Sequence, residues 1–254
     1  MVRAAIDLAL ALNPVVLAQR VGLEELDPWQ ETLLKSRAKQ VIINCHRQAG
    51  KSSAAAIIAL HQALFLPPAL VLLLSPSLRQ SSELFRKVRG FYNALGDAAP
   101  PAVQVSALSF ELANGSRVVS LPGKEQTIRG FSDVALLVVD EASRVPDDLY
   151  QAARPMLAVS GGQLVLLSTP FGKRGFFFHE WTDGIGWERV KVTADQCPRI
   201  DQEWLERERQ AIGEWWFAQE YRCEFVESAS QVFSYDHVMA ALSPDIEALF
   251  GGVG

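Results

Sequence analysis

From Gln40 onwards, short apolar runs alternate with longer stretches that favour helices. The runs are Val41–Cys45, Val71–Leu74, Val134–Val139, Leu164–Leu167 and, last in the chain, Trp187–Thr193. Short, nearly uninterrupted apolar runs are typical of parallel strands that are buried on both faces. Strands that alternate with helices define an α/β domain. We therefore expect a mostly parallel central sheet flanked by helices, with Val134–Val139 and Leu164–Leu167 near its centre.

Helices and one hairpin are predicted between these strands. The alanine-rich stretch from Lys51 to Phe65 is expected to be a helix that ends at Pro67-Pro68, because a proline ring cannot continue a helix. A second helix is expected from about Gln80 to Leu95. The segment Leu108–Leu121 turns at Asn114-Gly115 between alternating strands, which predicts a β-hairpin beside the sheet.

The composition changes after the last expected strand, and this change sets the predicted domain boundaries. Charged and aromatic residues dominate two expected helices, Asp201–Gln210 and Glu214–Tyr221. We therefore predict an N-terminal helix and α/β core over residues 1–195, a helical lid subdomain over residues 196–235, and a linker or tail over residues 236–254.

Charge, cysteine content and hydropathy exclude several functional classes. The 254 residues include 24 Lys+Arg and 29 Asp+Glu, a net charge of −5, so bulk positive charge does not hold this chain to nucleic acid. Its three cysteines show no CxxC spacing, which indicates a reducing compartment and neither a disulfide framework nor a structural zinc site. No apolar run approaches the roughly 20 residues of a membrane span. Asp7, Asn13 and Pro14 interrupt the first apolar stretch, which favours an amphipathic helix over a signal peptide.

The segment between the first strand and its helix carries the clearest chemical signal. It is Cys45-His46-Arg47-Gln48-Ala49-Gly50-Lys51-Ser52, close to the GxxxxGK[ST] pattern of a phosphate-binding loop, with Cys45 in place of the first glycine. In such a loop, backbone N–H groups at a helix N-terminus bind phosphate, a lysine reaches the β- and γ-phosphates, and a hydroxyl binds Mg²⁺. Gly50, Lys51 and Ser52 supply these parts. Because the first glycine of the pattern is missing, this segment taken by itself could also be interpreted as a surface turn.

A second motif follows the strand at Val134–Val139. Leu136-Leu137-Val138-Val139-Asp140-Glu141-Ala142 is an apolar strand that ends in two carboxylates, the form of a Walker B segment. Ligands bind at the carboxyl ends of parallel strands. We therefore expect Asp140 to hold Mg²⁺ through water and Glu141 to act as the general base on the attacking water. The alternative interpretation is an ordinary strand followed by an acidic helix cap. The phosphate loop earlier in the chain, with a further strand between the two motifs, makes this alternative less favourable.

Two further segments accompany these motifs. Pro28-Trp29-Gln30 lies upstream of the first strand, and the amide of Gln30 can pair with an adenine edge. Ser168 and Thr169 end another buried strand with hydroxyls that can sense the γ-phosphate and relay its loss. Each signal is weak alone, since hydroxyls at a strand end are as often ordinary turn residues.

Taken together and in order, these segments resemble the ATPase domain of the large terminase subunit, the DNA-packaging motor of tailed bacteriophages. The segments that carry the resemblance are Pro28-Trp29-Gln30, Arg47-Gln48-Ala49-Gly50-Lys51-Ser52, Ile128-Arg129-Gly130, Val138-Val139-Asp140-Glu141-Ala142, Ser168-Thr169-Pro170, Gly172, Gly175, Glu220-Tyr221, Glu224-Phe225 and Val232-Phe233. The resemblance implies a P-loop NTPase of the RecA-like, ASCE type that binds ATP and Mg²⁺ and couples hydrolysis to translocation of double-stranded DNA into a procapsid.

The motifs and the resemblance together imply roles for individual residues. Glu141 is the expected catalytic base, with Arg47 acting in cis or Arg129 reaching into a neighbouring subunit as an arginine finger. The expected metal ligands are Ser52 and Asp140, the coupling residues are Ser168 and Thr169, and the nucleotide-binding residues are Pro28, Trp29, Gln30, Arg47, Gln48, Ala49, Gly50, Lys51, Ser52 and Ser53.

The resemblance also implies partners and a location. We expect double-stranded DNA, a portal protein and a small terminase subunit as partners, no membrane, and a ring of identical subunits when assembled or a monomer in isolation, in the cytoplasm of the host. Terminases of this kind carry a nuclease domain that opens with a metal-binding aspartate in a strand. Asp236 and Asp245 lie in no strand-borne carboxylate cluster, so we expect no nuclease activity from this chain.

Two alternative functions stay open at this point. A helicase or remodelling ATPase shares most of these motifs, but it usually has a second RecA-like lobe, and only helices and a tail are expected after Thr193. A nucleotide-binding regulator that switches without fast hydrolysis keeps the phosphate loop and does not need Glu141.

Overall fold

The computed structural model describes residues 2–122 and 130–227. Its strands are β1 (Gln40–Cys45), β2 (Leu70–Ser75), β3 (Ala102–Val105), β4 (Ser109–Leu112), β5 (Arg117–Pro122), β6 (Val134–Asp140), β7 (Gln163–Ser168) and β8 (Glu188–Val192). Its α-helices are α1 (Val2–Leu12), α2 (Pro14–Arg20), α3 (Pro28–Lys35), α4 (Lys51–Phe65), α5 (Leu78–Leu95), α7 (Asp147–Ala153), α8 (Gly175–Thr182), α9 (Gln202–Ile212) and α10 (Glu214–Glu220).

Within these residues, eight strands form one sheet in the order β3-β4-β5-β2-β6-β7-β1-β8. Parallel pairing joins β5, β2, β6, β7, β1 and β8, whereas β3, β4 and β5 pair in an antiparallel manner at one edge. The mostly parallel α/β sheet is therefore confirmed, with β6 and β7 inside it. The predicted hairpin at Asn114-Gly115 is also present, but its strands β4 and β5 belong to the sheet and form part of its antiparallel edge. In the sheet, the strand between β1 and β6 is β7 rather than β2, which precedes β6 in the sequence.

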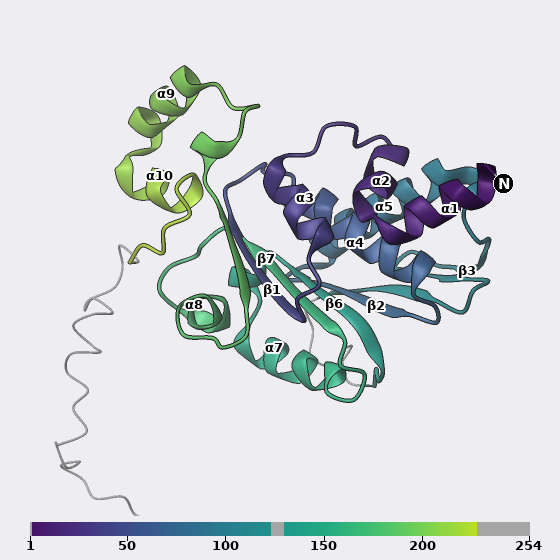
Figure 1. Cartoon of the computed structure of the whole chain (residues 1–254). Coiled ribbons are helices and arrows are strands. Elements are labelled where there is room, and N and C mark those ends of the chain that lie inside the picture. The colour runs from purple at the N-terminus through teal and green to yellow at the C-terminus, as the bar shows by residue number, and fades with distance from the viewer. Residues whose placement is uncertain (1, 123–129, 228–254) are drawn as a thin grey trace, which may run out of the picture.

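Helices cover both faces of the sheet, and each face has its own apolar core (Figure 1). Side chains of β6 alternate between the two: Leu136 and Val138 pack with residues of α4 and α5, and Leu137 and Val139 pack with residues of α7. Asp140 is the next residue on the α4 side, where it bonds to Ser52. The strand alternation thus aims the carboxylate at the helix that follows β1.

Local sequence signals determine where several helices begin. The predicted helix Lys51–Phe65 is confirmed as α4. The predicted helix from Gln80 begins earlier, at Leu78, because the Ser77 side chain accepts a hydrogen bond from the Gln80 amide and caps it. The expected N-terminal helix is divided in two, since Asn13 caps α2 by accepting from the Val15 amide. Elements α3, α7, α8 and β3 were not predicted from the sequence.

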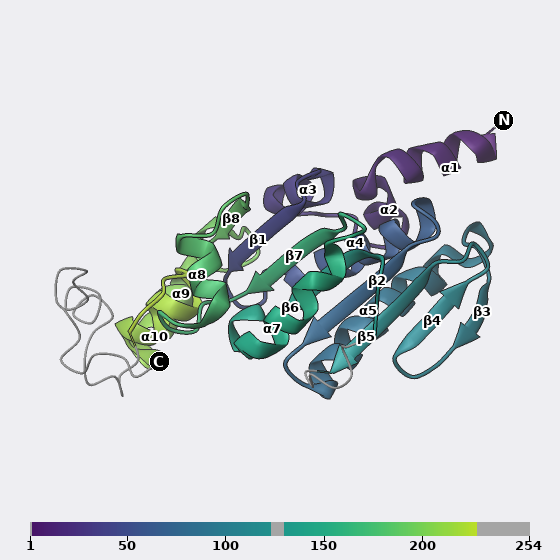
Figure 2. The same cartoon turned by 90° about the horizontal axis from the view of Figure 1, so that it is seen from below.

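The two helices predicted for the lid are confirmed as α9 and α10. They share a small apolar cluster that includes Leu205 and Phe217. The lid helices lie beyond β8, and α1 lies at the other end of the molecule (Figures 1 and 2). Residues 228–235 of the predicted lid, and the whole predicted tail, fall outside the described residues. In the part of the chain that the structure describes, no helix is long and apolar enough to cross a bilayer.

Candidate active site

The phosphate loop connects β1 to α4 at the carboxyl edge of the sheet. Gly50 has φ of +87°, in the left-handed region that strongly favours glycine, so the backbone conformation explains the glycine at this position. Cys45, which replaces the first glycine of the pattern, is the last residue of β1 and is fully buried. Burial raises the pKa of its thiol to about 12, so Cys45 acts as a neutral core residue. The loop itself therefore begins at His46.

Lys51, the first residue of α4, forms a buried ion pair with the Walker B segment. Its Nζ lies 3.2 Å from Glu141 Oε1, and only 9% of the Lys51 side chain is exposed. Burial by itself lowers the pKa of Lys51, but the interactions with Cys45, Glu141 and Asp140 outweigh it and raise the pKa above its usual value. Because the Cys45 thiol is neutral at pH 7, the two carboxylates hold this ammonium group charged.

Ser52 and Asp140 form a second link between the two motifs. Ser52 Oγ donates a hydrogen bond to Asp140 Oδ2 at 3.1 Å. Burial, and then the nearby charge of Glu141, raise the pKa of the Asp140 carboxyl, with Lys51 and Ser52 partly opposing them. The structure thus brings together all four residues that the sequence assigned to phosphate, metal and base chemistry.

Glu141 sits on a constrained turn directly after β6. Its φ is +52°, in the left-handed region that non-glycine residues rarely adopt, and its amide donates to Asp140 Oδ1 at 3.0 Å. This conformation turns the chain sharply at the strand end. The carboxylate of Glu141 thereby stays beside the phosphate loop.

Helix α5 contributes a wall that the sequence analysis did not assign to the site. A pocket of about 280 Å³ lies between Ser52, Asp140 and Glu141 on one side and α5 on the other. The residues of α5 that line it are Arg79, Gln80, Glu83, Leu84 and Lys87. Lys87 Nζ donates to Ser53 Oγ at 3.3 Å, which ties this helix to the start of α4. The available signal was the position of α5 after β2, a parallel strand that ends at the same edge.

Ser168 and Thr169, the expected coupling residues, are buried and bonded to a residue that the sequence analysis missed, Ser143. Ser143 Oγ lies 2.7 Å from Ser168 Oγ and donates to the Thr169 carbonyl at 2.8 Å. The Ser143 amide also donates to Ser168 Oγ at 3.2 Å. Ser143 follows Glu141 by two residues, so the segment Ser168-Thr169 is joined directly to the turn that carries the expected base.

Arg47 contacts helix α10. Its Nε lies 2.8 Å from Glu220 Oε2, and its amide donates to the Glu220 carbonyl at 3.3 Å. Arg144 Nη2 is 3.9 Å from the other carboxylate oxygen of Glu220. Glu220, the last residue of α10, is therefore held between the phosphate loop and the turn after β6. The expected catalytic role of Arg47 stays a prediction, and Arg129 lies outside the described residues.

The expected adenine motif lies against the phosphate loop. Pro28 begins α3, and Gln30 is buried, with its Oε1 accepting from the Asp27 amide at 2.9 Å. Gln30 Nε2 points to the carbonyl of Gly50 at 3.5 Å. The indole Nε1 of Trp29 is buried without a hydrogen-bond partner among the described residues. The sequence prediction that Gln30 contacts adenine stays a prediction.

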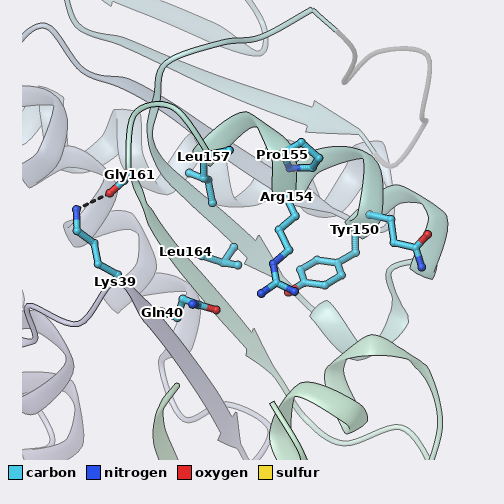
Figure 3. A pocket seen from close by; sticks show the side chains of 11 residues that line it. Lys39, Gln40, Tyr150, Arg154, Pro155, Leu157, Gly161 and Leu164 are labelled. Atoms are coloured by element: carbon cyan, nitrogen blue, oxygen red, sulfur yellow. Dashed lines mark hydrogen bonds between the residues drawn. The ribbon is translucent and has the colours of Figure 1, made fainter. Parts of the chain in front are cut away.

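A second pocket, of about 580 Å³, lies at the opposite edge of the sheet (Figure 3). Lys39, Gln40 and Leu164 line it from the amino ends of β1 and β7, and Tyr150 and Arg154 line it from the other side. None of the residues predicted for the active site lines this pocket.

A parallel sheet that brings a lysine-bearing phosphate loop and an acidic strand end to one edge, with one strand between them, defines a P-loop nucleotide-binding domain of the RecA-like, ASCE type. A family model described as "Terminase large subunit, T4likevirus-type, N-terminal" matches residues 42–238. The chain belongs to this terminase family, as its motifs predicted.

Relatives and solved structures agree with this assignment. The chain is 25% identical over 240 residues to the large terminase subunit of Thermus phage G20c, an alignment that covers 81% of this chain and 50% of that protein. The chain thus spans about half the length of the curated relatives it matches. Its fold is similar to that of the large terminase ATPase domain of Thermus phage P74-26, with a TM-score of 0.73, 23% identity, and coverage of 82% of this chain and 97% of that chain. It is also similar to the large terminase of bacteriophage HK97, with a TM-score of 0.61, 16% identity, and coverage of 81% and 45%.

Proposed function

We propose that this chain is the ATP-hydrolysing motor domain of a terminase that translocates double-stranded DNA into a viral procapsid. The observation that carries the proposal is the double link between the phosphate loop and the Walker B segment, Lys51 to Glu141 and Ser52 to Asp140. Structures of similar fold support it: the P74-26 domain is described as an ATPase domain, and the large terminase of a thermophilic bacteriophage was solved with ADP and with ATP-gamma-S.

In the proposed reaction, the phosphate loop binds ATP and Glu141 activates the attacking water. The loop amides and Lys51 bind the β- and γ-phosphates of ATP. A water molecule attacks the γ-phosphorus, its proton passes to Glu141, and ADP leaves. When Lys51 binds phosphate, its interaction with the Glu141 carboxylate weakens, and that carboxylate becomes available to the water. The ion pair with Lys51 thus holds the Glu141 carboxylate in position until nucleotide binds.

The donor set fits a magnesium ion. Ser52 Oγ and Asp140 Oδ2 are hard oxygen ligands on neighbouring elements, of the kind that Mg²⁺ prefers. Across residues 2–122 and 130–227, no group of three or more His, Cys, Asp or Glu side chains is arranged to hold a metal. The other ligands of such an ion would come from phosphate and water. When bound, the ion supplies neutralisation of the phosphate charge.

The remaining assignments of the family are part of the same proposal. Ser168 and Thr169 relay loss of the γ-phosphate through Ser143, which contacts both. Arg47 in cis or Arg129 in trans stabilises the transition state, and the subunits act as a ring on DNA. The portal protein and the small terminase subunit are the proposed protein partners.

The test is the turnover of Glu141→Gln, which keeps the size of the side chain and cannot accept the proton. We expect steady-state ATP hydrolysis to fall by about 10²–10⁴-fold, the usual range of general-base effects, while affinity for ATP stays within about twofold. Radiometric phosphate release and a fluorescent nucleotide measure the two quantities. Near-normal turnover would instead support a regulator that does not depend on hydrolysis at this site.

A further inference from the structure

We propose that Arg199 is a positioning residue for the nucleotide base: it holds α3, with Gln30, against the phosphate loop and so determines the affinity and selectivity for adenine nucleotides. The inference rests on the proposed function and adds a residue that neither the motifs nor the family resemblance contains. Arg199 lies between Cys197 and α9, on the segment that leads into the lid.

One nitrogen of the Arg199 guanidinium connects three segments of the chain. Nη2 lies 2.5 Å from Asp27 Oδ2, 3.4 Å from the Ala49 carbonyl, and 3.7 Å from Cys197 Sγ. Asp27 precedes α3, and Ala49 belongs to the phosphate loop. This single side chain therefore sets the distance between the helix of the adenine motif and the loop that binds phosphate.

The contact continues from Asp27 to Gln30. Asp27 is the N-cap of α3 and forms a capping box in which its own amide donates to Gln30 Oε1. Gln30 in turn points Nε2 to the Gly50 carbonyl, next to the Ala49 carbonyl that Arg199 contacts. Arg199, Asp27, Gln30 and two adjacent loop carbonyls thus form a closed ring of contacts, in which movement of Arg199 displaces Gln30.

This arrangement favours a positioning role over a role in stability. The Arg199 side chain is 56% exposed while that of Asp27 is 11% exposed, and solvent around the guanidinium screens the pair and reduces its contribution to the free energy of unfolding. Its planar guanidinium, by contrast, can bind a carboxylate and a carbonyl in one fixed geometry, which a lysine cannot reproduce. Loss of Arg199 should consequently loosen α3 relative to the loop without unfolding the domain.

The experiment compares Arg199→Ala with wild type in the whole chain. We expect the KM for ATP and the Kd for a fluorescent adenine nucleotide to rise about 10-fold, with kcat within about twofold, because ground-state binding of the base is lost and phosphate chemistry is kept. The preference for ATP over GTP should fall in the same variant. Arg199→Lys should recover part of the affinity, since its ammonium reaches Asp27 alone. Unchanged KM and Kd in Arg199→Ala would overturn the inference.

A matched control and two further variants separate the possible causes. Arg154→Ala removes an ion pair of similar exposure, 48% for Arg154, at the opposite edge of the sheet and should leave KM unchanged. Asp27→Asn keeps the cap and removes the charge, so it should raise KM as Arg199→Ala does, and the double variant should be no worse than either alone. If Asp27→Asn binds nucleotide like wild type, or if the two effects add fully, the inference is overturned.

Failure of the inference differs from failure of the proposed function. Lys51→Ala reports on the phosphate loop alone. Normal turnover in Lys51→Ala would overturn the proposed function and the inference with it. An inactive Lys51→Ala together with a wild-type KM in Arg199→Ala would overturn only the role of Arg199.

Discussion

The two edges of the same sheet carry pockets that differ in size and in the charged groups that line them. At the carboxyl edge, the pocket of about 280 Å³ is lined by Ser52, Asp140 and Glu141, and a largely buried lysine pairs with one of these carboxylates. At the amino edge, the pocket of about 580 Å³ (Figure 3) is mostly lined by apolar atoms. One of its lining residues, Arg154, forms an ion pair with Glu180 and is half-exposed. The size of a pocket therefore does not identify the reactive edge of the sheet. Charged side chains that are buried and paired with one another identify it.

The difference follows from the topology of parallel strands. Each strand that runs toward the carboxyl edge ends in a segment that turns back over the sheet, so motifs far apart in sequence converge there. Ser52 and Asp140 are 88 positions apart and form a hydrogen bond. Burial of Lys51 and Asp140 is unfavourable for folding, but phosphate chemistry requires charged groups in a site from which water is excluded.

The largest expected effect separates the two edges through their lysines. Lys51→Ala should reduce ATP turnover by about 10²-fold or more, since a preorganised charge on the phosphates is lost. In the wild type, the ammonium group of Lys39 donates to the Gly161 carbonyl at the amino edge. The variant Lys39→Ala should leave turnover unchanged. Phosphate-release assays on both variants test the comparison. Equal losses would show that the edges do not differ in function.

A smaller effect is expected at Ser143. Ser143→Ala removes the hydroxyl that bonds to Ser168 and Thr169, which should lower kcat about 10-fold by displacing the turn that carries Glu141, with little change in KM. Ser160→Ala is the matched control, because its hydroxyl donates to the Val134 carbonyl at the amino edge. Steady-state kinetics measure both. A change in KM alone would place Ser143 in nucleotide binding instead of in the coupling of the two segments.

The smallest effect concerns stability and its pH dependence. The raised pKa of Asp140 means that its ionised form is disfavoured in the folded chain, so stability falls as pH rises from the ordinary aspartate pKa through the raised one. Asp140→Asn should therefore melt a few degrees higher than wild type at pH 7 in chelator and without nucleotide. The difference should disappear at acidic pH, where the carboxyl is protonated in both the folded and unfolded chain. Calorimetry across pH checks this, and a variant that melts lower than wild type at pH 7 would contradict it.

Local patterns predicted those parts of the fold that depend on neighbouring residues. The predicted bounds of α4 match the structure, because its alanines, its start after Gly50 and its end before Pro67 are all local signals. Helix α7, seven residues long, follows Pro146 directly after the turn at the end of β6 and was not predicted from the sequence. Strand β3 lies at the sheet edge with largely exposed side chains, so it lacks the apolar run that identified the central strands.

The sequence by itself determined the class of fold and the four residues Lys51, Ser52, Asp140 and Glu141, because the phosphate loop and the acidic strand end are short contiguous patterns whose chemistry is local. Only the tertiary structure decided which partners surround them. Strand order brings Ser168 to Ser143, helix packing brings Lys87 and Glu220 to the phosphate loop, and Arg199 reaches Asp27 across 172 positions. Such contacts depend on how separate segments meet in space, and no periodicity along the chain encodes that meeting.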